Sequence, residues 1–348
     1  MIIRKQQDFD SFKCIADKCP KSCCIGWQIM IDEHSLNKYK NTDGEFSARI
    51  QSSVNFNNSS FRQHNTRCSM LNENGLCDLQ STLGEGYLCD TCRLYPRHTE
   101  EFLDLREYSL SLSCPEVVRM ILDSKYDFSF AESENEACDD PEEFEDFDFL
   151  IFDKLEYARE KMLKVASDKS IPLQDRMTFI ANAAYELQLL YDDGEIFAMD
   201  DVAYDGTNSN LKNTQGFDYC LKSLDVLIDM EALETSWTDS IIKTKKYWAM
   251  HQTDSKEWTA AMYPASELEF IFEKIFKSLL FTYFCGAIYD GQIYARAMIA
   301  VQSVRYIMMI YSATGDDLAS TIYLYSREVE HSDININSLI EYFEGELD

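Results

Sequence analysis

Hydrophobic residues recur every three or four positions through most of the second half of the chain. Apolar residues follow this spacing from Phe144 to Val165 and again from Leu173 to Tyr191. Such a period is typical of α-helices that bury one face. It therefore predicts a helical region, whose further members are expected over about 266–289, 292–313, 318–330 and 335–344.

Local signals mark where several of these helices begin and end. Ser266 and Glu269 have the spacing of a capping box, in which each side chain would bind a backbone N–H of the first turn. Gly194, Gly291 and Gly315 each follow the last apolar positions of a helical segment. Glycine commonly ends a helix because it adopts a left-handed conformation without strain.

The first third of the chain has a different pattern. Turn signals such as Cys19-Pro20 and Asn74-Gly75 interrupt it, and only short helices are expected, near 32–39 and 115–123. No alternating run is long enough to predict a large sheet. The fold class predicted is mainly α, with an irregular cysteine-rich N-terminal metal-binding domain packed on a C-terminal helical domain.

A strongly acidic segment separates these two regions. Acidic residues crowd together between positions 126 and 146, which is typical of a solvated linker leading into a helix. The predicted divisions are a cysteine-rich metal-binding domain over 1–125, an acidic linker over 126–145, and a helical domain over 146–348.

Composition limits the classes of partner. The chain of 348 residues has 32 basic and 61 acidic residues and a formal net charge of −29. Such a charge argues against binding to nucleic acid or to an anionic membrane through general electrostatics. It is compatible with a lysine-bearing partner, and its simplest consequence is solubility.

Location can also be predicted from the hydrophobic segments. Residues 1–8 are too polar for a secretory signal. The apolar segments 275–289 and 297–311 contain Lys277 and Arg305, respectively, and are shorter than a membrane span. They are therefore expected to be buried helices, and the protein is expected to be cytoplasmic and not membrane-bound.

Nine of the 12 cysteines lie within the first 114 residues, at short spacings: Cys14, Cys19, Cys23, Cys24, Cys68, Cys77, Cys89, Cys92 and Cys114. In a reducing compartment such a group favours metal binding over disulfides. Zinc would take four thiolates per ion, and a [4Fe–4S] cluster would also take four. Spacing alone leaves both open, whereas the later cysteines are interpreted as buried free thiols.

Several common catalytic motifs are absent from the sequence. The C-x3-C-x2-C spacing of radical enzymes that cleave S-adenosylmethionine is not found, nor is a Gly-x-Gly-x-x-Gly motif. The five histidines lie far apart along the chain, so no catalytic triad can be argued from them.

Taken together, the cysteine motifs and two C-terminal motifs resemble the flagellin lysine-N-methylase family. The matching segments are Cys14-x4-Cys19-x3-Cys23-Cys24-x2-Trp27, Cys68-x8-Cys77, Cys92-Arg-Leu-Tyr-Pro-Arg97, Ser111-Leu-Ser-Cys-Pro115, Tyr289-Asp-Gly-x2-Tyr-x-Arg296 and Tyr325-Ser-Arg-Glu-Val-Glu-His-Ser332. The resemblance extends over nearly the whole chain.

The resemblance implies transfer of methyl groups from S-adenosylmethionine to lysines of flagellin. It also implies a [4Fe–4S] cluster, with zinc as the alternative, held by cysteines at the matching positions. These are Cys14, Cys19, Cys23, Cys24, Cys68, Cys77, Cys92 and Cys114. Cys89 is left out of this ligand set.

Methyl transfer needs a neutral amine and a site that tolerates cationic groups. In the C-terminal motifs, Tyr294 and Tyr325 are candidates to flank the sulfonium or to receive the amine. Glu328 and Glu330 are candidates to bind the lysine or to take its proton.

Arg296 and Arg327 are candidates to bind the carboxylate of S-adenosylmethionine. The structural alternative is an ion pair between Arg327 and Glu330, which lie three positions apart, and tyrosines that only fill the core. The functional alternative is a non-enzymatic iron–sulfur or zinc-binding protein, acting in interactions or as a redox sensor.

Overall fold

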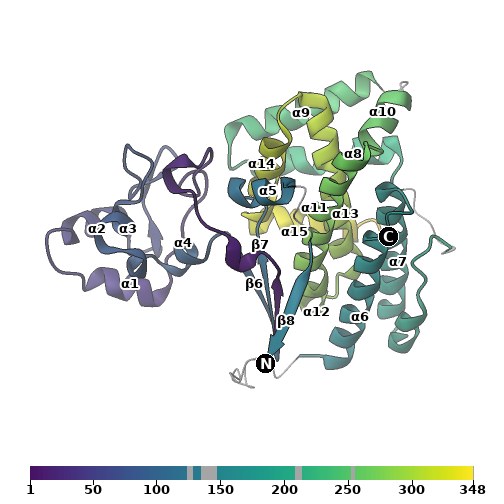
Figure 1. Cartoon of the computed structure of the whole chain (residues 1–348), viewed down its shortest axis with the longest axis horizontal. Helices are drawn as coiled ribbons and strands as arrows, with labels where there is room; N and C mark the ends of the chain where they lie inside the picture. The colour runs from purple at the N-terminus through teal and green to yellow at the C-terminus, as the bar shows by residue number, and fades with distance from the viewer. Residues whose placement is uncertain (124–127, 135–146, 208–213, 252–254, 348) are drawn as a thin grey trace.

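The computed structural model describes residues 1–123, 128–134, 147–207, 214–251 and 255–347. Helices account for 61% of the structure and strands for 11%, which confirms the mainly α prediction. Figure 1 shows a large helical body with a small lobe at its side, and a narrow sheet beneath the point where the two meet.

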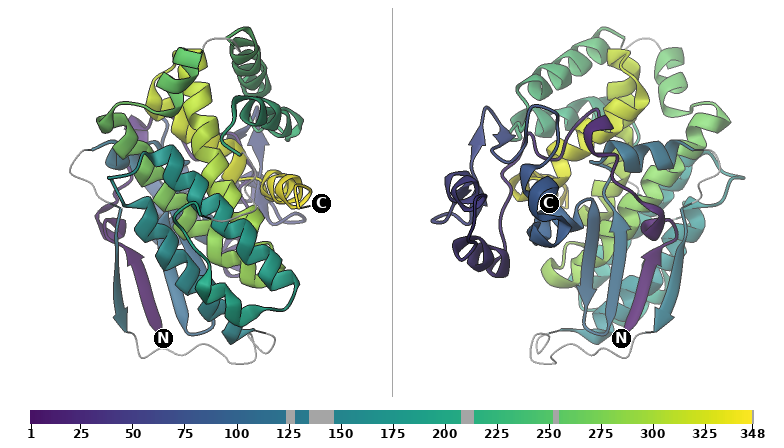
Figure 2. Two further views of the ribbon diagram at one scale, coloured as in Figure 1. Left: turned by 90° about the vertical axis from the view of Figure 1, so that its right-hand side faces the viewer. Right: turned by 60° about the vertical axis from the view of Figure 1, so that its left-hand side comes forward.

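The body consists of helices that pack around α13, and Figure 2 shows α13 surrounded from two further directions. The helices are α6 Phe149–Ala166, α7 Leu173–Asp192, α8 Phe217–Asp229, α9 Thr235–Met250, α10 Ser255–Met262, α11 Ser266–Tyr283, α12 Ala287–Asp290, α13 Ile293–Thr314, α14 Leu318–Glu330 and α15 Asp333–Glu344.

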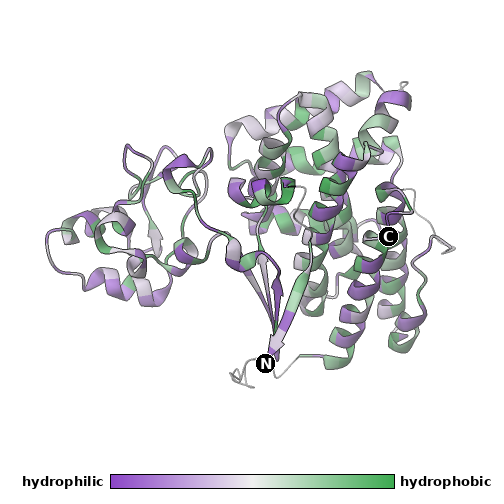
Figure 3. Ribbon diagram, viewed as in Figure 1, coloured by the Kyte–Doolittle hydropathy of each residue, from purple (hydrophilic) through white to green (hydrophobic). Residues whose placement is uncertain are grey.

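Helix α13 is hydrophobic on nearly all sides because α7, α9, α11 and α15 cover it. Within the described residues it is the one helix long and apolar enough to cross a membrane, and 94% of its apolar window is buried in the protein. This burial is typical of a core helix. The other helices alternate hydrophobic and hydrophilic colours along their length in Figure 3, as amphipathic helices do.

The predicted helices are largely confirmed. Those expected near 173–191, 292–313, 318–330 and 335–344 are present. The helix expected from Phe144 begins at Phe149, because the Asp148 side chain caps it by accepting from the backbone N–H of Ile151, and Phe144 itself lies outside the described residues. Gly194, Gly291 and Gly315 follow the predicted ends with φ angles of 75°, 72° and 72°.

Two predictions about the segment 266–289 are wrong. The capping box does not form, because Glu269 instead accepts a hydrogen bond from the backbone N–H of Leu173 at 2.9 Å. The helix also stops at Tyr283, and a 3-10 turn precedes α12. At this turn a Cβ on Gly286 would lie only 2.3 Å from an Arg296 nitrogen, so the close approach requires glycine.

A four-stranded sheet, which the sequence did not predict, lies against the body in the order β6-β7-β1-β8. Its strands are β1 Ile2–Gln6, β6 Arg97–Phe102, β7 Leu105–Leu110 and β8 Phe130–Glu134. β1 runs parallel to β7 and antiparallel to β8. β8 lies within the segment 126–145 that was expected to be a linker, and residues 135–146 lie outside the described part of the chain.

The small lobe has a hydrophobic core of its own, built around residues such as Ile29, Tyr39, Ile50 and Leu79. It contains the helices α1 Glu33–Lys40, α2 Ser47–Ser53, α3 Asp78–Leu83 and α4 Asp90–Leu94 and the short strands β2 Val54–Asn55, β3 Ser60–Phe61, β4 Gln63–His64 and β5 Arg67–Cys68. The short helix expected near 32–39 is therefore present.

The two cores divide the chain differently from the predicted boundary at residue 125. Phe9, Phe12 and Leu105 pack into the core of the body, as do Val118 and Ile121 from α5 Pro115–Leu122. The small lobe is thus an insertion between β1 and β6, and the sheet and α5 hold both of its ends against the body.

A buried ion pair joins the sheet to the body. Glu107 of β7, only 2% exposed, accepts from Arg159 of α6 at 2.6 Å and from Arg4 of β1 at 2.6 Å. Arg159 is buried as well. Breaking a buried pair is costly because it leaves a charge without compensation.

We expect Glu107→Gln to lower the free energy of unfolding by about 3–5 kcal/mol, as measured by urea unfolding, because Arg159 then loses its buried counter-charge. Glu132→Gln is the matched control, since Glu132 also pairs with Arg4 but is exposed. It should cost less than about 1 kcal/mol. Equal effects of the two changes would contradict the importance of burial.

Candidate functional site at the junction of the lobes

Helix α14 brings two of the sequence motifs together where the small lobe meets the body. The guanidinium of Arg327 lies over the ring of Trp27, 4.1 Å from its centroid, and donates to the backbone carbonyl of Ile25. Arg327 is 2% exposed. A desolvated cation–π contact of this kind contributes about 2 kcal/mol, and here it joins residues from opposite ends of the chain.

The residue that follows α14 completes an aromatic group around Trp27. The ring of His331 stacks on Trp27 at 4.1 Å, and Tyr95 lies 5.6 Å from both rings. Burial, together with the nearby Arg327 charge, lowers the pKa of His331 to about 4. The imidazole is therefore neutral at neutral pH.

A chain of hydroxyl groups connects His331 with Glu330. Nε2 of His331 lies 2.7 Å from the Ser113 hydroxyl, which lies 2.7 Å from that of Ser111. Ser111 donates to Oε2 of Glu330 at 3.3 Å, and the Tyr95 hydroxyl lies 3.1 Å from that of Ser113. Both serines belong to the Ser-Leu-Ser-Cys-Pro motif that precedes α5.

Glu330 is a buried carboxyl group that is only partly satisfied. Burial raises its pKa to about 7, although hydrogen bonds from Tyr283 and Ser111 and the nearby His98 act in the opposite direction. Within the described residues, its Oε1 has no hydrogen-bond partner, and neither has Nη1 of Arg327. Arg327 and Glu330 thus engage different partners, and each keeps one buried atom available.

Glu328 has a structural position. One carboxylate oxygen accepts from the backbone N–H of Leu233 at 2.8 Å and the other from that of Glu234 at 2.9 Å. Its side chain therefore fixes the segment that leads into α9. Burial raises its pKa to about 7.

Tyr325 faces the interior of the body. Its hydroxyl donates to Ser303 of α13 at 2.8 Å, and its ring contacts those of Trp237 and Tyr306. Successive residues of a helix point about 100° apart, so Tyr325 and Arg327 meet different neighbours although both lie on α14.

The other C-terminal motif forms a separate group. Arg296 pairs with Asp290 at 2.7 Å, and the Tyr294 hydroxyl donates to Glu346 at 3.1 Å. One link leads to the junction, because Arg296 donates to the carbonyl of Tyr283 at 3.3 Å and the Tyr283 hydroxyl reaches Glu330. Arg296 and Tyr294 thus belong to a group outside the junction of the small lobe and the body, whereas Arg327 and Glu330 lie at that junction.

The nine N-terminal cysteines are free thiols in two neighbourhoods. Those packed in the lobe's own core are Cys24, Cys68, Cys77, Cys89 and Cys92. Those whose charges influence one another near α5 are Cys14, Cys19, Cys23 and Cys114. Each of the eight predicted ligands thus lies in one of the two groups.

Hydrogen bonds between thiols join two pairs of cysteines. Cys23 and Cys24 are hydrogen bonded, which lowers the pKa of Cys24 to about 7, and Cys89 and Cys92 form a second hydrogen-bonded pair. Across the residues that the structure describes, no three His, Cys, Asp or Glu side chains are arranged to hold a metal ion. The donor chemistry suits zinc or an iron–sulfur cluster, whereas a formed metal centre is not part of this geometry.

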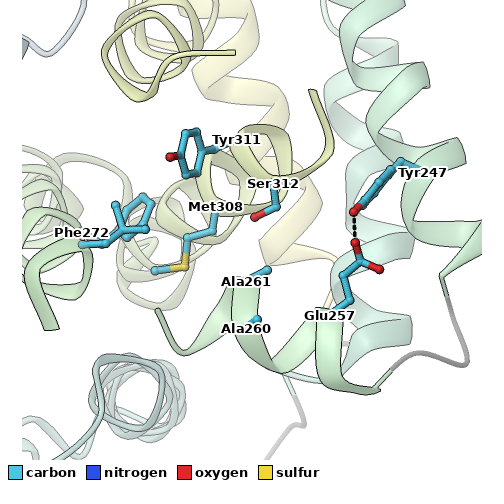
Figure 4. A pocket seen from close by; sticks show the side chains of 9 residues that line it. Tyr247, Glu257, Ala260, Ala261, Phe272, Met308, Tyr311 and Ser312 are labelled. Carbon is cyan, nitrogen blue, oxygen red and sulfur yellow. Dashed lines mark hydrogen bonds between the residues drawn. The ribbon is translucent and has the colours of Figure 1, made fainter. Parts of the chain in front are cut away.

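A cavity elsewhere in the body shows no relation to these motifs. It lies between α9, α10, α11 and α13 and is mostly apolar, with Tyr247 hydrogen bonded to Glu257 at one side (Figure 4). None of the residues predicted for the site lines it.

Sequence reasoning assigned no role to Trp27, Tyr95, Ser111, Ser113 and His331, although all five lie in motifs that carried the resemblance. Their place in these motifs was the available signal. Tyr283 also reaches Glu330 but gave no signal, because nothing distinguishes it from other aromatic residues of a buried helix.

Comparison with known proteins was made for sequence families, curated proteins and solved structures. A family model described as the FliB lysine N-methylase C-terminal domain matches residues 159–348, more than half of the chain. This range includes α14 and both C-terminal motifs. No solved structure matches.

The curated relatives match a shorter region. The chain is 33% identical over 120 residues to the flagellar biosynthetic protein FliU of Salmonella muenchen, which is 32% of this chain and 71% of FliU. It has the same identity, over the same number of residues, to lysine-N-methylases of Salmonella typhimurium and Salmonella choleraesuis. These matches span only 30% of the two methylases.

The low pKa of His331 predicts a specific acid sensitivity. Folding favours the neutral imidazole, so this stability is complete above the unfolded pKa near 6.5 and is lost as pH falls toward 4. Between pH 7 and pH 4.5 the loss should reach about 2 kcal/mol.

We expect His331→Phe, which keeps an aromatic ring on Trp27, to lose less stability than the unmodified protein over this pH range. Urea unfolding at both pH values measures the difference. His34→Gln is the control, because His34 is exposed on α1, and it should follow the unmodified protein. If the His331→Phe variant loses as much stability over this pH range as the unmodified protein, His331 is not a buried neutral group.

Proposed function

Because the chain belongs to the FliB lysine N-methylase family, we propose that it is a protein-lysine N-methyltransferase that uses S-adenosylmethionine and modifies flagellin. The two lysine-N-methylases and the flagellar protein FliU support the reaction class and the flagellar context. The reaction would take place in the cytoplasm.

One observation carries the choice of site. Arg327 and Glu330 have opposite charges, lie one turn apart on α14, and each has one buried atom without a partner among the described residues. Buried polar atoms are normally satisfied, so such a pair is suited to a ligand that brings both a negative and a positive group.

The chemistry of methyl transfer fits these two residues. S-adenosylmethionine supplies an electrophilic methyl group on a sulfonium and carries a carboxylate. Arg327, whose Nη1 is buried without a partner among the described residues, is placed to bind that carboxylate. Glu330, with a pKa of about 7, can accept a proton from the lysine ammonium near neutral pH.

The remaining predicted residues have supporting positions in this proposal. Glu328 holds the segment before α9, and Tyr325 packs against α13. Arg296 donates to the carbonyl of Tyr283, whose hydroxyl reaches Glu330, whereas Tyr294 donates to Glu346. We therefore assign contact with the substrates to Arg327 and Glu330 first.

An iron–sulfur cluster held by the N-terminal cysteines, with zinc as the alternative, is part of the same proposal. The soft thiol donors and their burial support it. The cluster would stabilise the small lobe, and the methyl transfer as proposed needs no electron from it.

We expect Glu330→Gln to reduce methyl transfer by roughly 100-fold or more, because the variant has no carboxylate to accept the lysine proton. Labelled S-adenosylmethionine and purified flagellin measure the transfer directly. Glu132→Gln is the control, since Glu132 is an exposed glutamate of the sheet, and should retain full activity. Undiminished transfer by Glu330→Gln would remove this residue from the mechanism.

The same transfer experiment with the unmodified protein distinguishes an enzyme from a binding protein. Transfer of label to lysines of flagellin supports the proposal. Binding of flagellin without any transfer would instead favour a non-enzymatic, metal-binding interaction protein.

We expect the double variant Cys19→Ser, Cys23→Ser to lose iron and solubility together, because thiolate ligands contribute folding energy through the metal that they bind. Iron, sulfide and zinc analysis of protein purified without oxygen measures the metal, and the absorbance spectrum identifies its form. Cys220→Ser, in the core of the body, is the control and should keep its metal content. A double variant that is soluble and folded and has an unchanged metal content would contradict the assignment of Cys19 and Cys23 as metal ligands.

A further inference from the structure

The hydroxyl groups between Glu330 and His331 form an unbroken hydrogen-bonded chain of Glu330, Ser111, Ser113 and His331. Ser113 is 0% exposed and Ser111 is partly buried, so bulk water has little access to the contacts between them. A carboxyl group at one end and an imidazole at the other are both able to gain and lose protons.

We propose that Ser111, Ser113 and His331 conduct the proton that Glu330 receives from the substrate to the outside of the junction. This inference rests on the proposed function, because methylation of a lysine ammonium releases one proton in each turnover. It gives Ser111 and Ser113 a role as positioning residues, and makes His331 the exit group.

The hydrogen bonds of this chain can all form whether Glu330 is ionised or protonated. When Glu330 is ionised, Ser111 donates to it, Ser113 donates to Ser111, and Nε2–H of His331 donates to Ser113. When Glu330 is protonated, all three hydrogen bonds reverse, and Nε2 of His331 accepts. Tyr95 donates to Ser113 in both arrangements, so every hydroxyl hydrogen has an acceptor in each state.

The two arrangements differ by the movement of one proton along each bond. The lysine ammonium loses a proton to Glu330, and the free amine attacks the methyl group while the sulfonium carbon–sulfur bond breaks. The proton of Glu330 then moves to Ser111 as the protons of Ser111 and Ser113 move on by one bond. His331 gains a proton on Nε2 and loses one from Nδ1 to water, which gives the Nε2–H tautomer of the ionised state. Exchange with water then moves this hydrogen to Nδ1, and the hydroxyl groups turn, before the next proton is conducted.

Other groups surround each end of the hydrogen-bonded chain. Glu330 faces Tyr283 of α11 and the His98–Glu100 pair of β6 in addition to Ser111. His331 is partly exposed, and its other neighbours are Trp27, Tyr95 and Arg327. The fixed positive charge of Arg327 disfavours an imidazolium, so a proton that arrives at His331 is released quickly.

Ser113 is the best position for a test, since its hydroxyl contacts Ser111, His331 and Tyr95. Ser113→Ala interrupts the chain, whereas Ser113→Thr keeps the hydroxyl. Ser338→Ala is a further control, because Ser338 is partly exposed on α15 and its hydroxyl donates to the Ile334 carbonyl of the same helix. Nitrogen NMR of the His331 ring is recorded across pH 5 to 9, together with single-turnover methylation.

We expect the His331 ring signals of the unmodified protein to shift as Glu330 titrates near neutral pH. This shift should vanish in Ser113→Ala and in Glu330→Gln and should remain in Ser113→Thr. Methylation by Ser113→Ala should be slower by roughly tenfold or more with an altered pH profile, and Ser113→Thr should restore most of the rate.

The two readouts separate the possible failures. If the ring signals never respond to Glu330, or still respond in Ser113→Ala, the proton path is wrong whatever the enzyme does. If Ser113→Ala and Ser113→Thr methylate equally well, the path is also wrong, while the proposed function stands. If the unmodified protein transfers no methyl group although the ring signals behave as expected, the proposed function fails and the coupling between Glu330 and His331 remains.

Discussion

The contact of Arg327 with Trp27 is the interaction on which the junction depends. The small lobe and the body have separate hydrophobic cores, so no continuous core joins them at this point. The guanidinium instead stacks on the indole ring and binds the carbonyl of Ile25. Gly26 makes the approach possible, since it has a φ angle of +108° and a Cβ there would lie 3.3 Å from Nη2 of Arg327. A larger residue would therefore strain the backbone and crowd the cation.

Chain topology keeps the lobe at this position. It leaves the body after β1 and returns at β6, and these strands lie in one sheet on either side of β7. Buried charges in the sheet, led by Glu107 with Arg159, attach it to α6. A rigid frame therefore holds both ends of the insertion. The contacts of Arg327 on α14 with Trp27 and Ile25 then hold the lobe beside the catalytic candidates.

The sequence predicted those features that a local pattern determines. Amphipathic periodicity located α7, α14 and α15, and glycines marked helix ends, because both follow from one segment alone. The sheet was missed because β1 pairs with strands about a hundred residues away and has no clear alternation. The motifs named Arg327 and Glu330, but they could not show that Glu328 holds the segment before α9 or that Tyr325 faces α13. Those differences come from the direction in which each side chain leaves the helix.

The net charge of the chain and the charges at the junction act on the same cationic partners. A methyl donor and a lysine ammonium are both cationic at their reacting ends, so a methylase must bring like charges together. The net charge of −29 favours the approach of such partners at long range, but at the junction screening is weak and local groups decide. Here His331 is neutral at rest and Glu330 titrates near neutral pH, so the net charge beside Arg327 changes when Glu330 takes up or loses a proton. In the proposed reaction, uptake of the lysine proton removes the charge of the ammonium and that of Glu330 together. The amine can then meet the sulfonium without like-charge repulsion, and the buried carboxyl is left in the neutral form that burial favours.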